Sequence, residues 1–158
     1  MASAWRVFPN GKYKIGKGTI PLSGGIYRLS LHRTSASANL IGAITVFTSV
    51  SFMSSGGGWG KSGAPGADKA NGQGLTLGSV SWASDGGSGW KWDAADPVFT
   101  ASASILSAVR YAVIRASAIS VNSGHIICYA ALSTAQFNIA SNNTLTIQMA
   151  PTGIFTLT

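Results

Sequence analysis

The sequence contains no glutamate and few charged residues of any kind. Eleven of its 158 residues are lysine or arginine and four are aspartate, so 9% of the chain is charged, against about 25% in an ordinary soluble domain. A long surface helix normally carries glutamate and lysine three or four positions apart, and this chain cannot supply such pairs. Coiled coils and charged helical bundles are therefore not expected, and a hydrophobic content of 46% argues against a disordered chain.

Short runs of alternating apolar and polar residues recur along the chain, which is the pattern of half-buried β-strands. In the run 26–32, Tyr27, Leu29 and Leu31 share one face and polar residues share the other. Turn residues separate the runs, and the length fits a single domain over residues 1–158. The sequence therefore predicts an all-β fold, a sandwich or a barrel. The further runs lie at 44–52, 75–82, 109–115, 125–132, 144–149 and 153–157.

Residues 101–116 fit two different patterns. Ile105, Leu106 and Val109 recur at helical spacing, and the alanine-rich sequence around them favours a helix by propensity. The apolar run between Arg110 and Arg115, in contrast, is rich in β-branched side chains and is typical of a buried strand. We predict a strand here, with a helix over 101–110 as the alternative.

Residues 54–74 hold eight glycines and one proline, and such a stretch loses much conformational entropy when it becomes ordered. The sequence therefore predicts a long glycine-rich loop, which becomes ordered against a partner. Trp59 lies in this loop. Because aromatic side chains often anchor protein interfaces, we predict that Trp59 is such an anchor.

The charges are unevenly distributed along the chain. Residues 1–33 carry six basic residues and no acidic one, all four aspartates lie within 68–96, and residues 116–158 carry no charged residue. The sequence therefore predicts that residues 1–20 form an extended basic segment that binds an acidic partner. Because a surface with so little charge tends to associate, we also expect a homo-oligomer or a larger assembly.

Glycine motifs and paired carboxylates give no convincing catalytic or cofactor site. The run 58–63 matches GxGxxG, but a dinucleotide site needs a helix immediately afterwards, and Pro65 follows instead. Asp93 and Asp96 are close in sequence, as the two carboxylates of a glycosidase can be. The dipeptide formed by Asp96 and Pro97 is nevertheless typical of a turn, so we interpret both aspartates as turn residues.

The histidines and the cysteine also have simple structural interpretations. His32 shares the polar face of its run with Arg28 and Ser30, which predicts a solvated surface histidine, and His125 follows a turn, which predicts the start of an edge strand. Cys128 is the only cysteine, and a lone cysteine is usually a buried small hydrophobe. The sequence therefore predicts neither catalytic nor cofactor-binding residues and no metal site, and we do not expect an enzyme or a small-molecule ligand.

No membrane-spanning segment is expected either. Residues 34–60 are free of charge and long enough to cross a bilayer. The run 44–52, however, carries threonine and serine at alternate positions, whereas a spanning helix is more continuously apolar.

Three segments in a fixed order resemble a known family. They are FPNGK at 8–12, followed by the strand IYRLSLH at 26–32; ADPVF at 95–99, which leads into AVRYAVI at 108–114; and LTIQMAPTGIFTL at 145–157. Their order and spacing resemble short bacteriophage virion structural proteins of the capsid decoration, or cement, type. The resemblance covers most of the chain outside the glycine-rich region. It implies a jelly-roll-like antiparallel β-sandwich on the outer surface of the capsid, with no cofactor and no catalytic residue.

These observations lead to a first functional hypothesis. The chain would be a virion protein that decorates the icosahedral head and bridges subunits of the major capsid protein, and removing residues 1–17 would abolish head binding without loss of the fold. Many modest contacts, multiplied over symmetric copies, suit such a role. The predicted capsid contacts are Trp5, Arg6, Lys12, Lys14, Lys17 and Trp59.

Two alternatives remain open at this point. A tail, fibre or baseplate component that recognises a host surface sugar would use Trp90, Trp92 and the loop 85–96 as a stacking platform, with Trp82 in the core. A basic nucleic-acid binder would also explain the net charge of +7. The basic residues and most tryptophans lie in different segments, however, so nucleic acid is not the expected partner.

Overall fold

A computed structural model describes residues 4–33, 74–101, 105–116 and 125–157 of the chain. These residues form several antiparallel sheets and one short helix, which confirms the prediction of a mainly β fold. The strands within the described ranges form no closed barrel. The predicted strand at 44–52, Trp59 and all of the glycine-rich loop except Gly74 lie outside these ranges.

The largest sheet has six antiparallel strands in the order β1-β8-β7-β2-β3, with β9 also paired to β7. Strand β7 lies at its centre and pairs with β2 along one edge and β8 along the other. The strands span Arg6–Val7 (β1), Tyr27–Arg33 (β2), Leu75–Thr76 (β3), Leu106–Ala116 (β7), His125–Ala131 (β8) and Phe137–Ile139 (β9).

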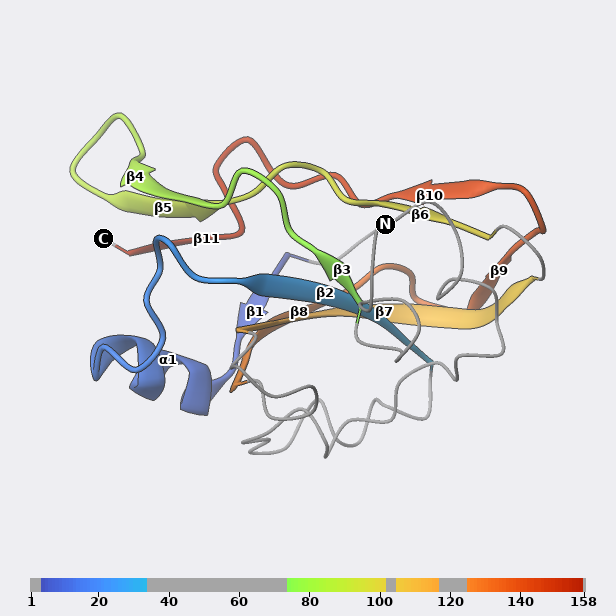
Figure 1. Ribbon diagram of the computed structural model, residues 1–158, viewed down its shortest axis with the longest axis horizontal. Coiled ribbons are helices and arrows are strands. Elements are labelled where there is room, and N and C mark those ends of the chain that lie inside the picture. The colour runs from blue at the N-terminus through green and yellow to red at the C-terminus, as the bar shows by residue number, and fades with distance from the viewer. Residues whose placement is uncertain (1–3, 34–73, 102–104, 117–124, 158) are drawn as a thin grey trace.

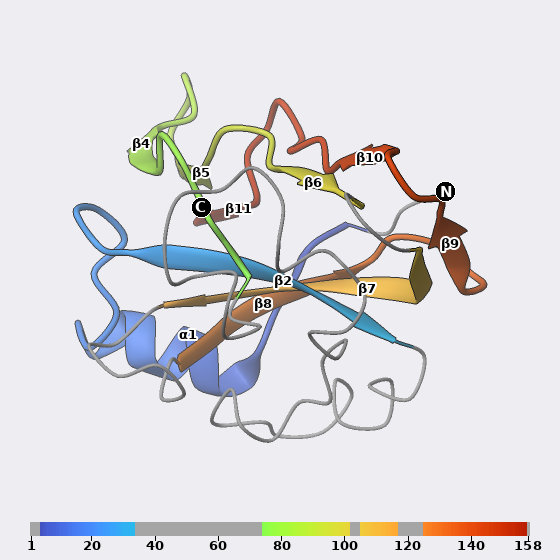
Figure 2. The same cartoon turned by 45° about the vertical axis from the view of Figure 1, so that its right-hand side comes forward.

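Two smaller sheets lie over one face of this large sheet, and the helix α1 (Pro9–Gly16) lies on the opposite side (Figures 1 and 2). One small sheet has the order β11-β5-β4, and the other pairs β10 with β6. Their strands span Ser81–Ser84 (β4), Trp90–Asp93 (β5), Val98–Thr100 (β6), Thr144–Thr146 (β10) and Phe155–Leu157 (β11). The main hydrophobic core lies between these two layers.

Strand β2 shows how the core is built. Tyr27, Leu29 and Leu31 are buried in the main core, as their alternation predicted. The prediction that His32 is solvated is wrong, because its side chain is completely buried and shares a hydrogen bond of 2.8 Å with the buried Ser30 hydroxyl. A second apolar cluster lies on this face of the sheet, so both faces of β2 are covered. The buried members of that cluster are Phe8, Tyr111, Val113 and Ile126.

Residues 106–116 form a strand, as predicted, despite their helical spacing. Because β7 pairs on both sides, its ladder hydrogen bonds outweigh the helix propensity of alanine. The register shifts between Leu106 and Val109, where Ala108 has a φ of 63°. The amide of Ala108 donates a hydrogen bond of 2.9 Å to Oδ1 of Asn138. This bulge bends β7, which allows β9 to pair with its first residues.

The prediction of an extended segment over residues 1–20 is wrong, because Pro9–Gly16 form a helix. Pro9 occupies the first turn, where its fixed φ favours the helix and its missing amide proton costs nothing. Phe8 anchors the start of the helix: its side chain is buried, and its amide donates a hydrogen bond of 2.9 Å to the carbonyl of Ile127. Gly18, with a φ of 72°, then turns the chain away. The basic segment is therefore folded onto the large sheet.

We predict that Gly11→Ala destabilises the protein. A Cβ atom at Gly11 would lie 2.7 Å from the backbone oxygen of Ile127, so α1 would have to move away from β8. We expect the free energy of unfolding to fall by about 1–3 kcal/mol. At Gly16, in the same helix, a Cβ atom would meet nothing within 4 Å, so Gly16→Ala should leave stability unchanged or raise it by up to about 1 kcal/mol. Urea unfolding checks both, and equal stability of the two variants would contradict this packing.

Candidate partner-binding surface

Four of the predicted contact residues form what we call the N-terminal basic surface, which consists of Arg6 on β1 and Lys12, Lys14 and Lys17 on and just after α1. Arg6, Lys12 and Lys17 are exposed and Lys14 is half-buried. No acidic residue occurs before Asp68 in the sequence, so nothing in residues 4–33 neutralises these charges. The aspartates that the structure describes all belong to the segments of β4 to β6, in the other layer.

Helical geometry places these charges on different sides of α1. Lys14 and Lys17 are three residues apart and therefore share one side, where the ammonium of Lys17 lies 5.5 Å from the ring centre of Tyr13. Lys12 lies beside Ile15 and Gly16 on another side, at the mouth of a hollow. The structure thus gathers the lysines on one short helix without merging them into one site. An extended acidic partner suits such a distribution better than a single anion does.

Trp5, the remaining predicted contact in the described residues, is only partly available to a partner. Its side chain is half-buried and packs against the main core. The exposed part lines a hollow of about 650 Å³, together with Ala4 and residues 148–156. Trp5 therefore serves as one wall of a groove and is not a free anchor. Trp59 lies outside the described residues.

A second hollow of about 320 Å³ lies next to the first. It is lined by Val7 of β1, by Lys12, Ile15 and Gly16 of α1, and by Phe155 and Thr156 of β11. Phe155 and Thr156 also line the larger hollow, so both hollows border β11. We call the two together the N-terminal groove.

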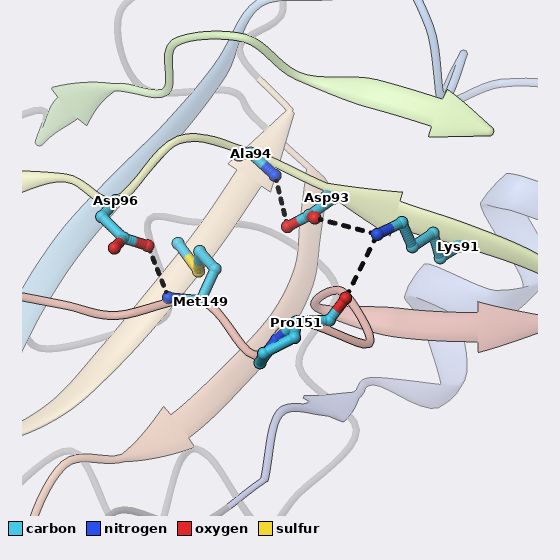
Figure 3. A network of polar contacts seen from close by, with 6 residues as sticks. All are labelled: Lys91, Asp93, Ala94, Asp96, Met149 and Pro151. Atoms are coloured by element: carbon cyan, nitrogen blue, oxygen red, sulfur yellow. Dashed lines mark hydrogen bonds and ion pairs between the residues drawn. The ribbon is translucent and has the colours of Figure 1, made fainter. Parts of the chain in front are cut away.

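Polar contacts hold the wall of this groove in place (Figure 3). A carboxylate oxygen of Asp96 accepts a 2.7 Å hydrogen bond from the amide of Met149. The ammonium of Lys91 donates one of 3.1 Å to the carbonyl of Pro151 and lies 3.7 Å from the carboxylate of Asp93. Asp93 also accepts a hydrogen bond from the amide of Ala94. Asp93 is the last residue of β5 and pairs with Ser81, so its interpretation as a turn residue is wrong, whereas Asp96 lies in the connection between β5 and β6.

Gly153 completes the rigid wall. Its φ of 86° is a conformation that favours glycine, and a Cβ atom there would lie 2.9 Å from the carbonyl oxygen of Trp92. The next residue, Ile154, donates a 2.7 Å hydrogen bond to that same oxygen. Residues 148–154 therefore have a defined shape before any partner binds. The sequence signalled this turn through its proline and glycine, but it did not reveal the groove, which forms only when β11 lies near β1 and α1.

The tryptophans of the small sheet lie on one face of β4 and β5, but they differ in exposure. Trp92 is fully buried, Trp82 is half-buried against the core, and Trp90 is 51% exposed. The rings of Trp82 and Trp90 stack with centres 6.1 Å apart. Trp92 therefore cannot stack on a sugar, which corrects the alternative site that included it. The prediction that Trp82 belongs to the core is met only in part.

The histidines, the cysteine and the aspartates were each assigned a structural role from the sequence. Within the described ranges, no three of the His, Cys and Asp side chains lie close enough to hold a metal ion. Cys128 is completely buried, as predicted, and burial raises the pKa of its thiol well above the ordinary value. His125 is half-buried at the start of β8, which pairs with both β1 and β7, so it does not begin an edge strand as predicted. No helix of the described chain is long and apolar enough to cross a membrane.

No family model, no curated protein and no solved structure matches this chain. The function is therefore argued from the surfaces of the molecule. The two that stand out are the N-terminal groove with its basic surface, and the exposed Trp90 stacked on Trp82.

Proposed function

We propose that this chain is a non-enzymatic structural protein of a bacteriophage virion, which decorates the outer surface of the head by bridging subunits of the major capsid protein. The observation that carries this proposal is the acid-free basic surface on a helix anchored to the sheet. Because α1 is already folded, its exposed lysines bind an acidic surface without the entropy cost of ordering a flexible arm. A rigid groove beside them supplies apolar contact area.

The remaining features suit the same role. Attachment to a shell needs many modest contacts, and avidity over symmetric copies turns them into firm binding. We therefore propose that the protein acts as a homo-oligomer. We also propose that the two layers belong to a jelly-roll-like sandwich, with Trp59 and the glycine-rich loop 54–74 as a second contact with the shell.

Cosedimentation with purified heads stripped of this protein tests the proposal. We expect saturable binding, with a plateau of the same order as the number of capsid subunits. Binding should weaken as salt is raised from 50 mM to 500 mM, because exposed charges are screened beyond about 10 Å already at 0.1 M salt. Failure to bind, or binding that never saturates, would contradict the proposal.

The exposed Trp90 supports a second candidate function, the recognition of a host surface sugar by a tail, fibre or baseplate protein. Its ring is stacked on Trp82 and lies beside the turn 85–89, where Oδ1 of Asp85 accepts hydrogen bonds from the amides of Gly87 and Gly89. Such a rigid aromatic platform suits a pyranose ring. Glycan binding that is lost in Trp90→Ala would favour this function, whereas the decoration role predicts no glycan binding.

A further inference from the structure

Two strand edges border the N-terminal groove. Strand β1 is at the end of the large sheet and pairs with β8, and β11 is at the end of a small sheet and pairs with β5. Among the described strands neither has a second neighbour. Val7 of β1 and Phe155 of β11 line the same hollow, so the groove separates two layers that are not joined there by a ladder of hydrogen bonds (Figure 1).

We propose that an extended segment of a partner protein enters this groove and adds a strand to the free edge of β11. The segment would have acidic side chains alternating with apolar ones. This inference rests on the proposed function, since the segment would belong to the major capsid protein. It identifies backbone pairing as the mode of attachment, in addition to the electrostatic contacts with α1.

The alternation of side chains along β11 determines which side chains of the partner segment face the groove. Phe155 points toward the core and packs on Trp92, with ring centres 5.3 Å apart, whereas Thr156 is exposed. A strand added beside β11 continues this alternation, because neighbouring residues of a strand point to opposite faces. Every second side chain of the partner then enters the apolar hollow next to Val7 and Ile15.

Charge decides which side chains the partner carries. Lys12 lines the hollow together with apolar residues, and no acidic residue precedes Asp68 in the sequence. On the opposite wall, Lys91 and the two nearby aspartates hold residues 149–151 in place. The exposed charge of Lys12 attracts a carboxylate on either face of the segment, because exposed charges act over about 10 Å at 0.1 M salt, and it repels an ammonium group.

A peptide titration of the intact protein tests strand addition. The probe is a capped six-residue peptide of alternating valine and glutamate, followed by NMR of the backbone amides. We expect shifts concentrated at Val7, Ile15, Phe155 and Thr156. A second peptide, N-methylated at every other residue on the edge toward β11, keeps all side chains but loses the backbone donors, and it should bind at least tenfold more weakly. Equal binding of the two peptides, or no binding of the first, would overturn strand addition.

A pair of glycine variants locates the site. A side chain at Gly16 grows into open space at the hollow, and one at Gly78 grows into open space next to β4, with nothing within 4 Å of either Cβ. Gly16→Phe is expected to lower the affinity for the valine–glutamate peptide at least tenfold, and Gly78→Phe to leave it unchanged. Equal affinities would overturn this location. A peptide in which lysine replaces glutamate should bind at least tenfold more weakly, and equal binding would contradict the role of Lys12.

The failure of this inference is distinguishable from failure of the proposed function. If the protein binds heads but not the peptide, strand addition is wrong and the decoration role stands. If it binds the peptide but not heads, the edge is a strand-binding site and the decoration role is wrong. Sedimentation equilibrium tests whether a second copy of this chain occupies the groove instead. Self-association that is abolished by Gly16→Phe would show this and would overturn the proposal.

Discussion

Replacing Trp92 with alanine is expected to lower the free energy of unfolding by about 3–5 kcal/mol. Trp92 is fully buried between the layers, where its ring packs on Tyr27 at 5.0 Å and on Phe155 at 5.3 Å. Its indole nitrogen also donates a 3.0 Å hydrogen bond to the carbonyl of Leu22. The substitution therefore leaves a large cavity and removes the partner of a polar group. Because domains of this size are stable by only about 5–15 kcal/mol, this loss removes between about a fifth and nearly all of the stability.

Trp90→Ala is the matched control. It removes the same side chain two residues earlier in β5, but from a position that is 51% exposed. We expect a loss of no more than about 1 kcal/mol. Urea unfolding monitored by circular dichroism measures both variants. A loss below about 1 kcal/mol for Trp92→Ala, or equal losses for the two, would show that the layers do not pack around Trp92.

Neutralising the N-terminal basic surface is expected to weaken binding to heads by about 15- to 250-fold. The variant combines Arg6→Gln, Lys12→Gln, Lys14→Gln and Lys17→Gln. An exposed ion pair typically contributes about two- to fourfold in affinity, and four such contacts multiply when they act on one partner. The fold should survive, because the buried groups that anchor the helix, Phe8 and Gly11, are unchanged. Deletion of residues 1–17 is a poorer test, because it removes these anchors and β1 and should destabilise the whole protein.

A second variant separates local charge from net charge. Ser107→Glu, Thr134→Glu, Ser141→Glu and Thr144→Glu change four exposed positions outside the groove. Both variants lower the net charge by four, from the +7 of the natural chain to the same value. We expect the glutamate variant to bind heads within about threefold of the natural chain, because its basic surface is intact. Equal weakening of the two would show that only overall charge matters.

The sequence predicted much of the fold because alternation reports burial directly. Tyr27, Leu29 and Leu31 were assigned to the core from their spacing and are buried there. The same alternation failed for His32, since a polar residue on a strand is solvated only if nothing covers its face, and packing against that face is a tertiary property. Near β7, helical spacing and alanine content disagreed with the β-branched content of 109–114, and pairing on both sides makes residues 106–116 a strand.

The candidate site was only partly predictable. The acid-free run of lysines identified the basic surface, because composition alone reveals an excess of charge. Its conformation was missed, although the proline at position 9 and the glycines after residue 15 were signals for a short helix. The groove was not foreseen, because Val7, Ile15 and Phe155 are far apart in sequence and only the docking of the layers brings them together.

The number of copies of this chain in each particle is the most direct measure of its role, and quantitative protein analysis of purified virions provides it. We expect a copy number comparable to that of the major capsid protein, as required of a protein that covers the shell. A count of a few to a few tens would place the chain in the tail or at a vertex and would favour the sugar-binding role of Trp90. Its absence from purified particles would contradict every role in the virion.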